Sequence, residues 1–407
     1  MNSRNATGIT LRSVFGQIDK SRLAEVFWAS GTNREFIDIP YVKLDYSKLS
    51  AGKILSRFSR GSVNAAIKKN NDVQAKRNKL PEYVRQFFAC MMDASRIDLN
   101  REMIGKISEY KPDVIYTLGA SVNSLKTSYI LSKELSVPIV IHYMDNWLFH
   151  LQWEKNPLLY FYKKKLRKYA RLCRERGNCG ICISEGMAKE YTDFTGKKHT
   201  AIMNSIDTKK FLCEKVPYRV PVRFCYAGGL HLGRDKMLLK IARALGEVSD
   251  LIKKPCEMVI YTGKDNIERY KGEFGRVNIK WCEAVPHERI TEVYNGADVL
   301  IHTEVLNGDM NEFIKYSVST KISEYLSTGK PILFLGPESI YLYKLLSEKD
   351  MAFTACDDET LKEALVKILR CDDVFTKTQN ALNFVKENFD ICVSAERFNK
   401  TVESARL

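Results

Sequence analysis

The alternation of short apolar runs with amphipathic segments is the feature of this sequence that most constrains its fold. Seven runs have the length and nearly continuous apolar character of buried strands: residues 113–118, 138–144, 180–184, 222–229, 257–263, 297–303 and 331–336. Helix-like segments separate most of them. Buried strands that alternate with helices are typical of parallel sheets built from right-handed βαβ crossovers. The sequence therefore predicts an α/β fold.

The chain is predicted to divide into two doubly wound domains. Its 407 residues leave room for two to three domains. Residues 204–221 show no clear helical period and contain two prolines, and a second strand–glycine–helix series begins directly after them. We expect these residues to link an N-terminal domain, residues 1–205, to a C-terminal domain, residues 206–383. Residues 384–407 have the pattern of helix without a strand.

Charge is divided unevenly along the chain. Residues 1–200 carry 34 Lys and Arg against 19 Asp and Glu, whereas residues 201–407 carry 30 of each. The whole formal excess of +15 therefore lies in the N-terminal half. Such an excess favours a polyanionic partner: nucleic acid, an anionic membrane or a phosphate-bearing substrate. A merely solvated basic surface is the simpler alternative.

Composition excludes several classes of protein. A hydrophobic content of 45% and a charged content of 28% are those of a globular protein rather than a disordered or fibrous one. No stretch approaches 18 uninterrupted apolar residues, and the first residues lack the apolar core of a secretory signal. Eleven scattered cysteines, an odd number, favour reduced thiols over a disulfide framework. We therefore expect a cytoplasmic protein without a membrane-spanning helix.

One strand–helix turn in the second half carries residues suited to a phosphate ligand. In parallel sheets, ligands bind at the carboxyl ends of strands, where helix N-termini present N–H groups. Gly228 and Gly229 end a strand, and a short loop then leads to Arg234 and Lys236 just before a helix. Glycines let backbone approach a ligand closely, and two cations can neutralise a diphosphate. An ordinary turn with solvated charges would have the same pattern.

A second turn precedes a helix that begins near residue 320. Ser319 or Thr320 has the residue type of an N-cap, and such a cap leaves N–H groups for a phosphate. Glu324 could accept hydrogen bonds from two vicinal hydroxyls, as a ribose requires. The alternative is that Glu324 only favours the helix dipole.

These motifs, in this order, resemble those of a bacterial glycosyltransferase of the GT-B fold, specifically of the large retaining group 1 family, also called family 4. The second half contributes YAGGLHLGR, EMVIYTG, VPHERITEVYNGADVLIHT and STKISEYLSTGKPILFLGP, and the first half contributes IVIHYMDNW, ICISEGMAKEY and IMNSID. The resemblance covers nearly the whole chain and is most specific from Ser319 to Pro331. It implies two Rossmann-like domains with a cleft between them, and a C-terminal helix that returns to pack on the first domain.

The resemblance also implies a binding site for a nucleotide-sugar donor. Arg234 and Lys236 would hold the donor's diphosphate beside Gly228 and Gly229. The N–H groups at Ser319 and Thr320 would add to that cradle. The donor is a substrate, and neither a cofactor nor a metal ion is implied.

Further roles follow from the same resemblance. Glu324 would bind the ribose, and the backbone near Val285 would face the base. Asp145, at the end of the strand in IVIHYMD, would line the cleft on the acceptor side and act in catalysis with Arg234 and Lys236. Gly8 would lie in the family's glycine-containing N-terminal loop, under the sugar phosphate.

The sequence departs from the family pattern at three places. Tyr316 stands eight positions before Glu324, where the family has the first of two paired glutamates. Met144 replaces the histidine often found just before the strand-end aspartate, and His142, two residues earlier, has the setting of a buried structural histidine. The family's first strand, which normally precedes the glycine loop, is expected to be absent or truncated.

Other chemistry finds little support in the sequence. Cys179 and Cys182 form a CxxC pair, but GNCGICIS also alternates as a strand does, and no second pair or histidine cluster accompanies it at a metal-ligand spacing. Neither GxxxxGK[ST] nor GxGxxG is present. The alternatives to a transferase are a nucleotide-sugar epimerase of the same architecture, a nucleic-acid-binding protein and a non-catalytic homologue.

The basic half has a use in the transferase hypothesis. Residues 147–162 hold six aromatic side chains, and residues 163–176 hold eight Lys and Arg and one Glu. Aromatic side chains beside a cationic helix suit a surface that lies on anionic lipid. We therefore expect peripheral binding to the inner face of the cytoplasmic membrane and a glycan or polyprenyl-diphosphate-linked acceptor, and no nucleic-acid partner.

Overall fold

Contacts within the chain divide it into two compact units, Met1–Ala201 with Arg397–Leu407, and Ile202–Glu396. The structure, a computed structural model, describes residues 6–28, 39–44, 82–95, 99–147, 149–150, 159–213, 217–272, 274, 279–306 and 311–406. Each unit has its own sheets and its own core.

The first unit contains two parallel sheets. Four strands pair in the order β3-β4-β5-β6, and β1 pairs with β2. The strands are β1 Glu25–Trp28, β2 Tyr41–Leu44, β3 Ile115–Leu118, β4 Ile139–Tyr143, β5 Cys179–Cys182 and β6 Lys198–Ala201. The helices are α1 Ala6–Phe15, η1 Lys20–Arg22, α4 Glu82–Asp93, α5 Arg101–Ser108, α6 Val122–Leu135, α7 Tyr160–Glu175 and α8 Glu185–Thr195.

Local sequence explains why these elements form. All five residues of β4 are buried, as expected for a central strand covered on both faces. Ser121 caps α6 by accepting a hydrogen bond from the Ser124 N–H, and Ser184 caps α8 by accepting one from the Met187 N–H. Each of these helices begins after a short turn that follows a parallel strand.

The C-terminal helix α17, Ile391–Ser404, ends within the first unit. The Phe398 ring lies 5.3 Å from that of Phe15 and 5.6 Å from that of Tyr116. The Arg406 guanidinium forms an ion pair of 2.8 Å with Asp113. The prediction that this helix returns to the first domain is confirmed.

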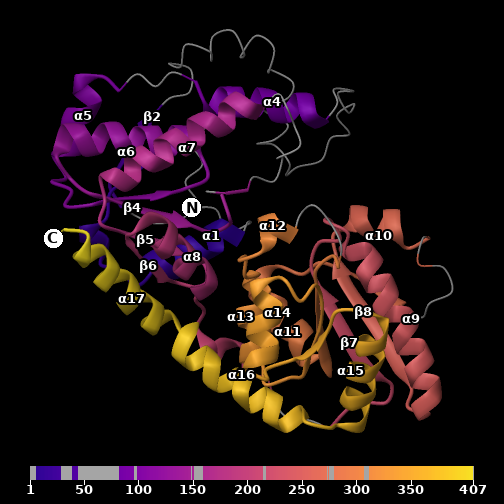
Figure 1. The fold of residues 1–407 in the computed structure, drawn as a ribbon. Helices are drawn as coiled ribbons and strands as arrows, with labels where there is room; N and C mark the ends of the chain where they lie inside the picture. Colours follow the sequence, from indigo (N-terminus) through magenta and orange to yellow (C-terminus); the bar gives the residue numbers. More distant parts are fainter. Residues whose placement is uncertain are drawn as a thin grey trace. The chain divides into compact units, whose positions relative to one another are not determined.

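The second unit is built on one six-stranded parallel sheet in the order β9-β8-β7-β10-β11-β12. Two of its strands, β7 and β8, are labelled in Figure 1. Numbered within the unit, this is the order 3-2-1-4-5-6 of a Rossmann fold. Its strands are β7 Val222–Ala227, β8 Cys256–Thr262, β9 Ile279–Glu283, β10 Val299–Thr303, β11 Ile332–Leu335 and β12 Phe353–Ala355. Its helices are η4 Thr208–Phe211, α9 Arg234–Ile252, α10 Lys264–Tyr270, η5 His287–Arg289, α11 Ile290–Asn295, α12 Asn311–Ile314, α13 Thr320–Ser327, α14 Tyr341–Glu348, α15 Asp358–Arg370 and α16 Val374–Asn388.

The core of the second unit lies between the sheet and its helices. Every residue of β10 and of β11 is buried. Helix α9 turns Leu238, Ile241 and Leu245 into the core, at the spacing that places side chains on one helical face. On the same side, α9 packs against α15. The predicted α/β fold is confirmed, and each of the seven predicted strands is present.

The stretch predicted as a linker belongs to the second unit by its contacts. The Asn204 side-chain amide donates to the Val318 carbonyl at 2.7 Å, and the Ile206 N–H donates to the Phe389 carbonyl at 2.9 Å. The contact-based boundary falls between Ala201 and Ile202.

Gly8 lies inside helix α1, so its predicted placement in a loop is wrong. A glycine within a helix costs ~1 kcal/mol relative to alanine. Packing of the same helix offsets this cost, because Val14 is buried and the Phe15 ring lies 5.0 Å from that of Tyr116. The expected absence of the family's first strand concerns residues before α1, which lie outside the described residues.

No helix in the described part of the chain is both long enough and apolar enough to cross a bilayer.

Candidate functional site

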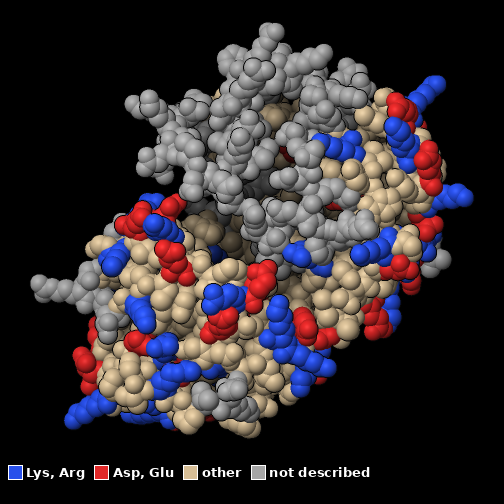
Figure 2. All heavy atoms as spheres, turned by 180° about the vertical axis from the view of Figure 1, so that it is seen from behind, with Lys and Arg blue, Asp and Glu red and all other residues tan. Residues whose placement is uncertain are grey.

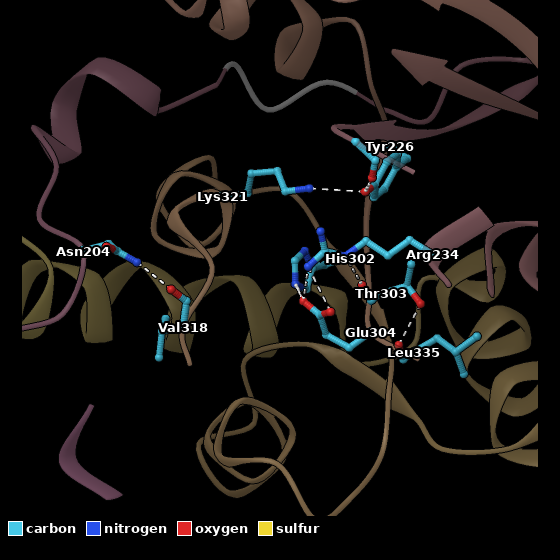
Figure 3. A network of polar contacts seen from close by, with 10 residues as sticks. Asn204, Tyr226, Arg234, His302, Thr303, Glu304, Val318, Lys321 and Leu335 are labelled. Atoms are coloured by element: carbon cyan, nitrogen blue, oxygen red, sulfur yellow. Dashed lines mark hydrogen bonds and ion pairs between the residues drawn. The ribbon is translucent and has the colours of Figure 1, made fainter. Parts of the chain in front are cut away.

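The neighbouring strands β7 and β10 mark the point where the strand order of the second unit reverses. In open parallel sheets, ligands bind outside the carboxyl ends of the strands at such a point. β7 ends at Ala227 and β10 ends at Thr303. The candidate site is therefore built from the residues that follow these two ends: the turn at Gly228, the start of α9, Glu304, and the start of α13. Figure 3 shows Arg234, Glu304 and Lys321 of this site.

Gly228 leaves room for a cation from another element. A Cβ atom at this position would lie 2.4 Å from Lys321 Nζ and 3.2 Å from the Tyr226 hydroxyl oxygen. Any side chain here would displace the ammonium group. In the next residue, the Gly229 carbonyl accepts a hydrogen bond of 2.7 Å from the Tyr226 hydroxyl, which fixes the turn. The predicted glycine turn is thus present, and its glycine at 228 accommodates Lys321.

Arg234, the first residue of α9, is held by the end of β10. Its Nη2 donates to both carboxylate oxygens of Glu304, at 2.7 and 2.9 Å, and its Nε donates to the Thr303 carbonyl at 3.3 Å (Figure 3). The two side chains are 13% and 10% exposed. Gly233 caps this helix with a φ of 76°, in the left-handed region that glycine adopts without strain.

Glu304 is ionised over the physiological pH range. Burial by itself raises the pKa of this carboxyl, but its interactions with His302 and the charge of Arg234 outweigh burial and lower the pKa to about 2. His302 Nε2 lies 3.3 Å from Glu304 Oε1. Burial lowers the pKa of His302 to about 4, so this imidazole is neutral at pH 7.

Lys321, the second residue of α13, is the second cation of the site. Its Nζ lies 4.6 Å from the centroid of the Tyr226 ring and 3.4 Å from the Tyr226 hydroxyl (Figure 3). Burial, together with the charge of Arg234, lowers the pKa of Lys321 to about 7. Lys321 was not predicted from the sequence. A usable signal was present, because a lysine in the first turn of a helix opposes the helix dipole and so calls for another role.

The start of α13 has the form predicted from the sequence. Ser319 is the N-cap, and its side chain makes no capping hydrogen bond. The helix therefore presents its first N–H groups without the usual side-chain acceptor. Lys321 belongs to this first turn, which lies at the edge of the sheet where β10 ends. Helix N-termini of this kind favour anions.

Glu324 is buried and has specific partners on both carboxylate oxygens. His287 Nε2 lies 2.8 Å from Oε1, and the Tyr294 hydroxyl donates to Oε2 at 2.5 Å. The hydrogen bond to Glu324 raises the pKa of His287, whose side chain is 42% exposed. Glu324 therefore does more than stabilise the helix dipole, because it forms hydrogen bonds with side chains of two other elements. Its predicted contact with a ribose stays a prediction, and a ribose would have to share this carboxylate with His287.

The structure does not bring Lys236 to Arg234. Lys236 is exposed on α9, and no contact joins it to the Arg234–Glu304 pair among the residues that the structure describes. Residues two apart on a helix do not face each other, because each residue turns the helix by about 100°. Lys321, rather than Lys236, supplies the second cation.

The remaining predicted residues occupy the expected positions in the chain. Val285 is half-buried in the loop between β9 and η5, two residues before His287. Tyr316 precedes α13, and the Lys315 ammonium lies 4.9 Å from its ring centroid. Asp145 belongs to the first unit and is separated from the end of β4 only by Met144; its carbonyl accepts a hydrogen bond of 2.7 Å from the Trp147 N–H. The roles predicted for Val285 and Asp145 stay predictions.

His142 and the CxxC cysteines have structural settings. His142 is fully buried, and its Nδ1 lies 2.6 Å from the Tyr116 hydroxyl. Cys179 and Cys182 are separated by three positions on β5, which places their side chains on opposite faces of the sheet. All eleven cysteines are free of disulfides.

Metal-ligand side chains do not cluster in the described ranges, where no three His, Cys, Asp or Glu side chains come together in a way that could hold an ion. That the reaction needs no metal stays a prediction.

Comparison with known proteins identifies the fold. No family model matches the chain. An uncharacterized glycosyltransferase of Methanocaldococcus jannaschii is 22% identical over 268 residues, which are 61% of this chain and 63% of that protein, so the match spans less than two thirds of the relative.

Among solved structures, Anabaena HepE in complex with UDP aligns over 99% of this chain and 98% of its own, with a TM-score of 0.65 and 13% identity. Sucrose-phosphate synthase from Thermosynechococcus elongatus aligns over 82% of each chain, with a TM-score of 0.56 and 13% identity. The resemblance seen in the sequence is therefore confirmed at the level of the fold: the chain is built on the GT-B fold of two Rossmann-like domains that these proteins share.

Proposed function

We propose that this chain is a retaining group 1 (family 4) glycosyltransferase, which moves a sugar from a nucleotide-diphosphate sugar to a surface-glycan acceptor. The observation that carries the proposal is the meeting of Arg234, Lys321 and the N-terminus of α13 at the switch point of the second unit. Two cations and a helix N-terminus form a site suited to a diphosphate. The relative named as a glycosyltransferase and the UDP complex of HepE support the proposal.

The chemistry assigned to this site is stabilisation of a leaving group. The bond from the anomeric carbon to the phosphate oxygen breaks, and a bond to the acceptor oxygen forms on the same face of the sugar. The acceptor proton passes to the departing phosphate oxygen. Arg234, Lys321 and the α13 N–H groups would meet the negative charge that develops on the diphosphate, and groups fixed before the reaction stabilise such charge most strongly. Asp145 would contact the acceptor.

Recognition of the nucleoside is assigned to the loop after β9 and to α13. Glu324, held by His287 and Tyr294, would accept hydrogen bonds from the ribose hydroxyls. The backbone near Val285 would face the base, since it belongs to the loop that leads into η5 and His287.

A peripheral place on the inner face of the cytoplasmic membrane is part of the proposal. Helix α7 buries Leu166, Ala170 and Cys173, and at its N-terminus Tyr160 and Phe161 are 61% and 74% exposed. Exposed aromatic side chains beside cations are suited to an anionic lipid surface and to a polyprenyl-diphosphate acceptor.

One face of the molecule carries both signs of charge. In Figure 2, basic and acidic side chains are interspersed over the described part of the face shown. Nine Lys and Arg and two Asp of the basic half fall between residues 45 and 81, which lie outside the described residues.

The test is incubation of the purified protein with a panel of nucleotide sugars that differ in base and sugar. We expect one donor to release its nucleoside diphosphate and to protect the protein against melting, and the anomeric configuration of the product, measured by NMR, to match that of the donor. Conversion of the donor into a second nucleotide sugar without acceptor would identify an epimerase instead. Absence of binding to every donor, with tight binding to duplex or single-stranded nucleic acid, would overturn the proposal.

A further inference from the structure

Glu304 is an acidic residue in a site that we propose binds an anion. It follows β10 directly, and its side chain is 10% exposed. Its backbone is fixed as well, because its N–H donates to the Leu335 carbonyl of β11 at 2.9 Å. A carboxylate in this place opposes diphosphate binding, so its presence calls for a reason.

Glu304 determines which edge of Arg234 is left for a ligand. The Glu304 carboxylate occupies Nη2, and the Thr303 carbonyl occupies Nε. Within the described part of the chain, only Nη1 of this guanidinium has no hydrogen-bond partner, and it is not among the buried atoms. Two of the three nitrogens are thus used to orient the third.

The charge of Glu304 has a second consequence. The low pKa of this carboxyl keeps it ionised, so it offsets the charge of Arg234. Once the proton received from the acceptor is lost to solvent, a nucleoside diphosphate carries one more negative charge than the nucleotide sugar from which it is formed. Repulsion by Glu304 therefore acts more strongly on the product than on the donor.

We propose that Glu304 is a positioning residue, which fixes the Arg234 guanidinium toward the leaving diphosphate and by its charge limits how tightly the product is retained. This inference rests on the proposed glycosyltransferase function. It assigns to Glu304 a role in turnover, separate from any direct contact with the sugar.

Two substitutions separate the two parts of this role. Glu304→Gln keeps the size of the side chain and removes its charge. Glu304→Asp keeps the charge and moves the carboxylate back by one methylene. The matched control is Glu247→Gln, which removes an exposed carboxylate from the same helix as Arg234, where it pairs with Lys362.

Binding is measured by calorimetry with uridine diphosphate and uridine, or the corresponding pair for the base that the donor panel selects. We expect Glu304→Gln to bind the diphosphate about tenfold more tightly and the nucleoside unchanged, because only the diphosphate is repelled by the carboxylate. Glu304→Asp should keep the wild-type affinity for both ligands. The control should match the wild type.

Turnover is measured as release of nucleoside diphosphate. Glu304→Asp should lower kcat about tenfold or more at an unchanged KM, because Arg234 loses its orientation. Glu304→Gln should also lower kcat, with a burst of product in the first turnover that shows release to be rate-limiting. If Glu304→Gln does not fold, the Glu304→Asp variant alone still tests the positioning role.

The outcomes distinguish this inference from the proposed function. If the wild type binds no nucleoside diphosphate, the proposed function and this inference both fail. If the wild type binds and turns over while both Glu304 variants behave like the Glu247 control, the inference alone fails. Weaker diphosphate binding by Glu304→Gln would also overturn it, since it would mean that the carboxylate helps to hold the ligand.

Discussion

Replacing Lys321 by Met should stabilise the protein against unfolding and, at the same time, remove most of its affinity for a nucleoside diphosphate. Methionine has a similar length and fills the space next to Tyr226 without a charge. A structural lysine would give the opposite result in stability. Higher stability together with weaker diphosphate binding is expected only of a cation whose burial destabilises the fold and whose charge binds a ligand.

The size of the stability change follows from the pKa of Lys321. Burial lowers this pKa from 10.5 to about 7. At ~1.4 kcal/mol per pKa unit, the cost of charging the folded state reaches ~5 kcal/mol, and contact of the side chain with solvent reduces it to ~2 kcal/mol. Between pH 7 and 10.5 the unfolded state binds more protons than the folded state, so the wild type gains stability as the pH rises through this range. Below pH 7 the full cost is present.

Urea denaturation at pH 6 and at pH 9 measures this difference. We expect Lys321→Met to be ~2 kcal/mol more stable than the wild type at pH 6, with a smaller difference at pH 9. Lys362→Met removes an exposed lysine that pairs with Glu247, and this control should change the free energy of unfolding by less than ~0.5 kcal/mol at either pH.

Calorimetry gives the second arm of the same test. A trianionic ligand raises the pKa of Lys321, so diphosphate binding to the wild type near pH 8 should take up a proton. The uptake is measured as a difference in binding heat between two buffers of different ionisation enthalpy. Lys321→Met should lose this uptake and bind the diphosphate about tenfold more weakly or worse. A variant that is less stable at pH 6 and binds normally would refute the reasoning.

Three further predictions concern other residues of the proposal. Arg234→Ala should lower turnover by about 100-fold or more, because it removes a charge-assisted contact that strengthens in the transition state; near-normal release of nucleoside diphosphate would move the leaving-group site elsewhere. Glu324→Gln should weaken binding of the nucleoside diphosphate by ~1–3 kcal/mol, measured by calorimetry, whereas unchanged affinity would leave Glu324 only its contacts with His287 and Tyr294. Lys164→Gln with Lys168→Gln should weaken binding to anionic vesicles by ~2 kcal/mol in a flotation assay, and wild-type protein that ignores such vesicles but binds nucleic acid would contradict the membrane proposal.

Every central strand in the described part of the chain could be predicted from the sequence, whereas β3 is the one edge strand there that was predicted. The seven predicted strands include β4, β10 and β11, which are buried along their length and therefore read as continuous apolar runs. The missed strands β6, β9 and β12 lie at the edges of their sheets, and the missed strands β1 and β2 form a two-stranded sheet in which both strands are edges. An edge strand has one neighbour and more exposed residues, as in the sequence IKWCE of β9, so its apolar pattern is broken.

The candidate site was predicted only in part, because some of its residues lie far apart in the sequence. Arg234 stands next to a glycine turn and could be recognised locally. The partners of Arg234 come from the end of β10, 69 and 70 residues away along the chain, and the second cation, Lys321, comes from α13. That β10 is the neighbour of β7 is a property of the strand order, and no local pattern contains it. The local pattern therefore suggested Lys236, whereas the fold supplies Lys321.

The charges of the candidate site fit a reaction in which negative charge increases on one group. Before the reaction, Glu304 offsets Arg234, and Lys321 is only partly protonated at neutral pH, so the attraction for a bound donor is modest. As the diphosphate departs in the proposed reaction, the negative charge that develops on it raises the pKa of Lys321. The same charge strengthens the contact of the diphosphate with Nη1 of Arg234. Both contacts are then stronger in the transition state than in the ground state, which is the condition for raising kcat rather than only lowering KM. After transfer, the charge of Glu304 opposes retention of the product. A site with two uncompensated cations would bind the donor more tightly and release the diphosphate more slowly.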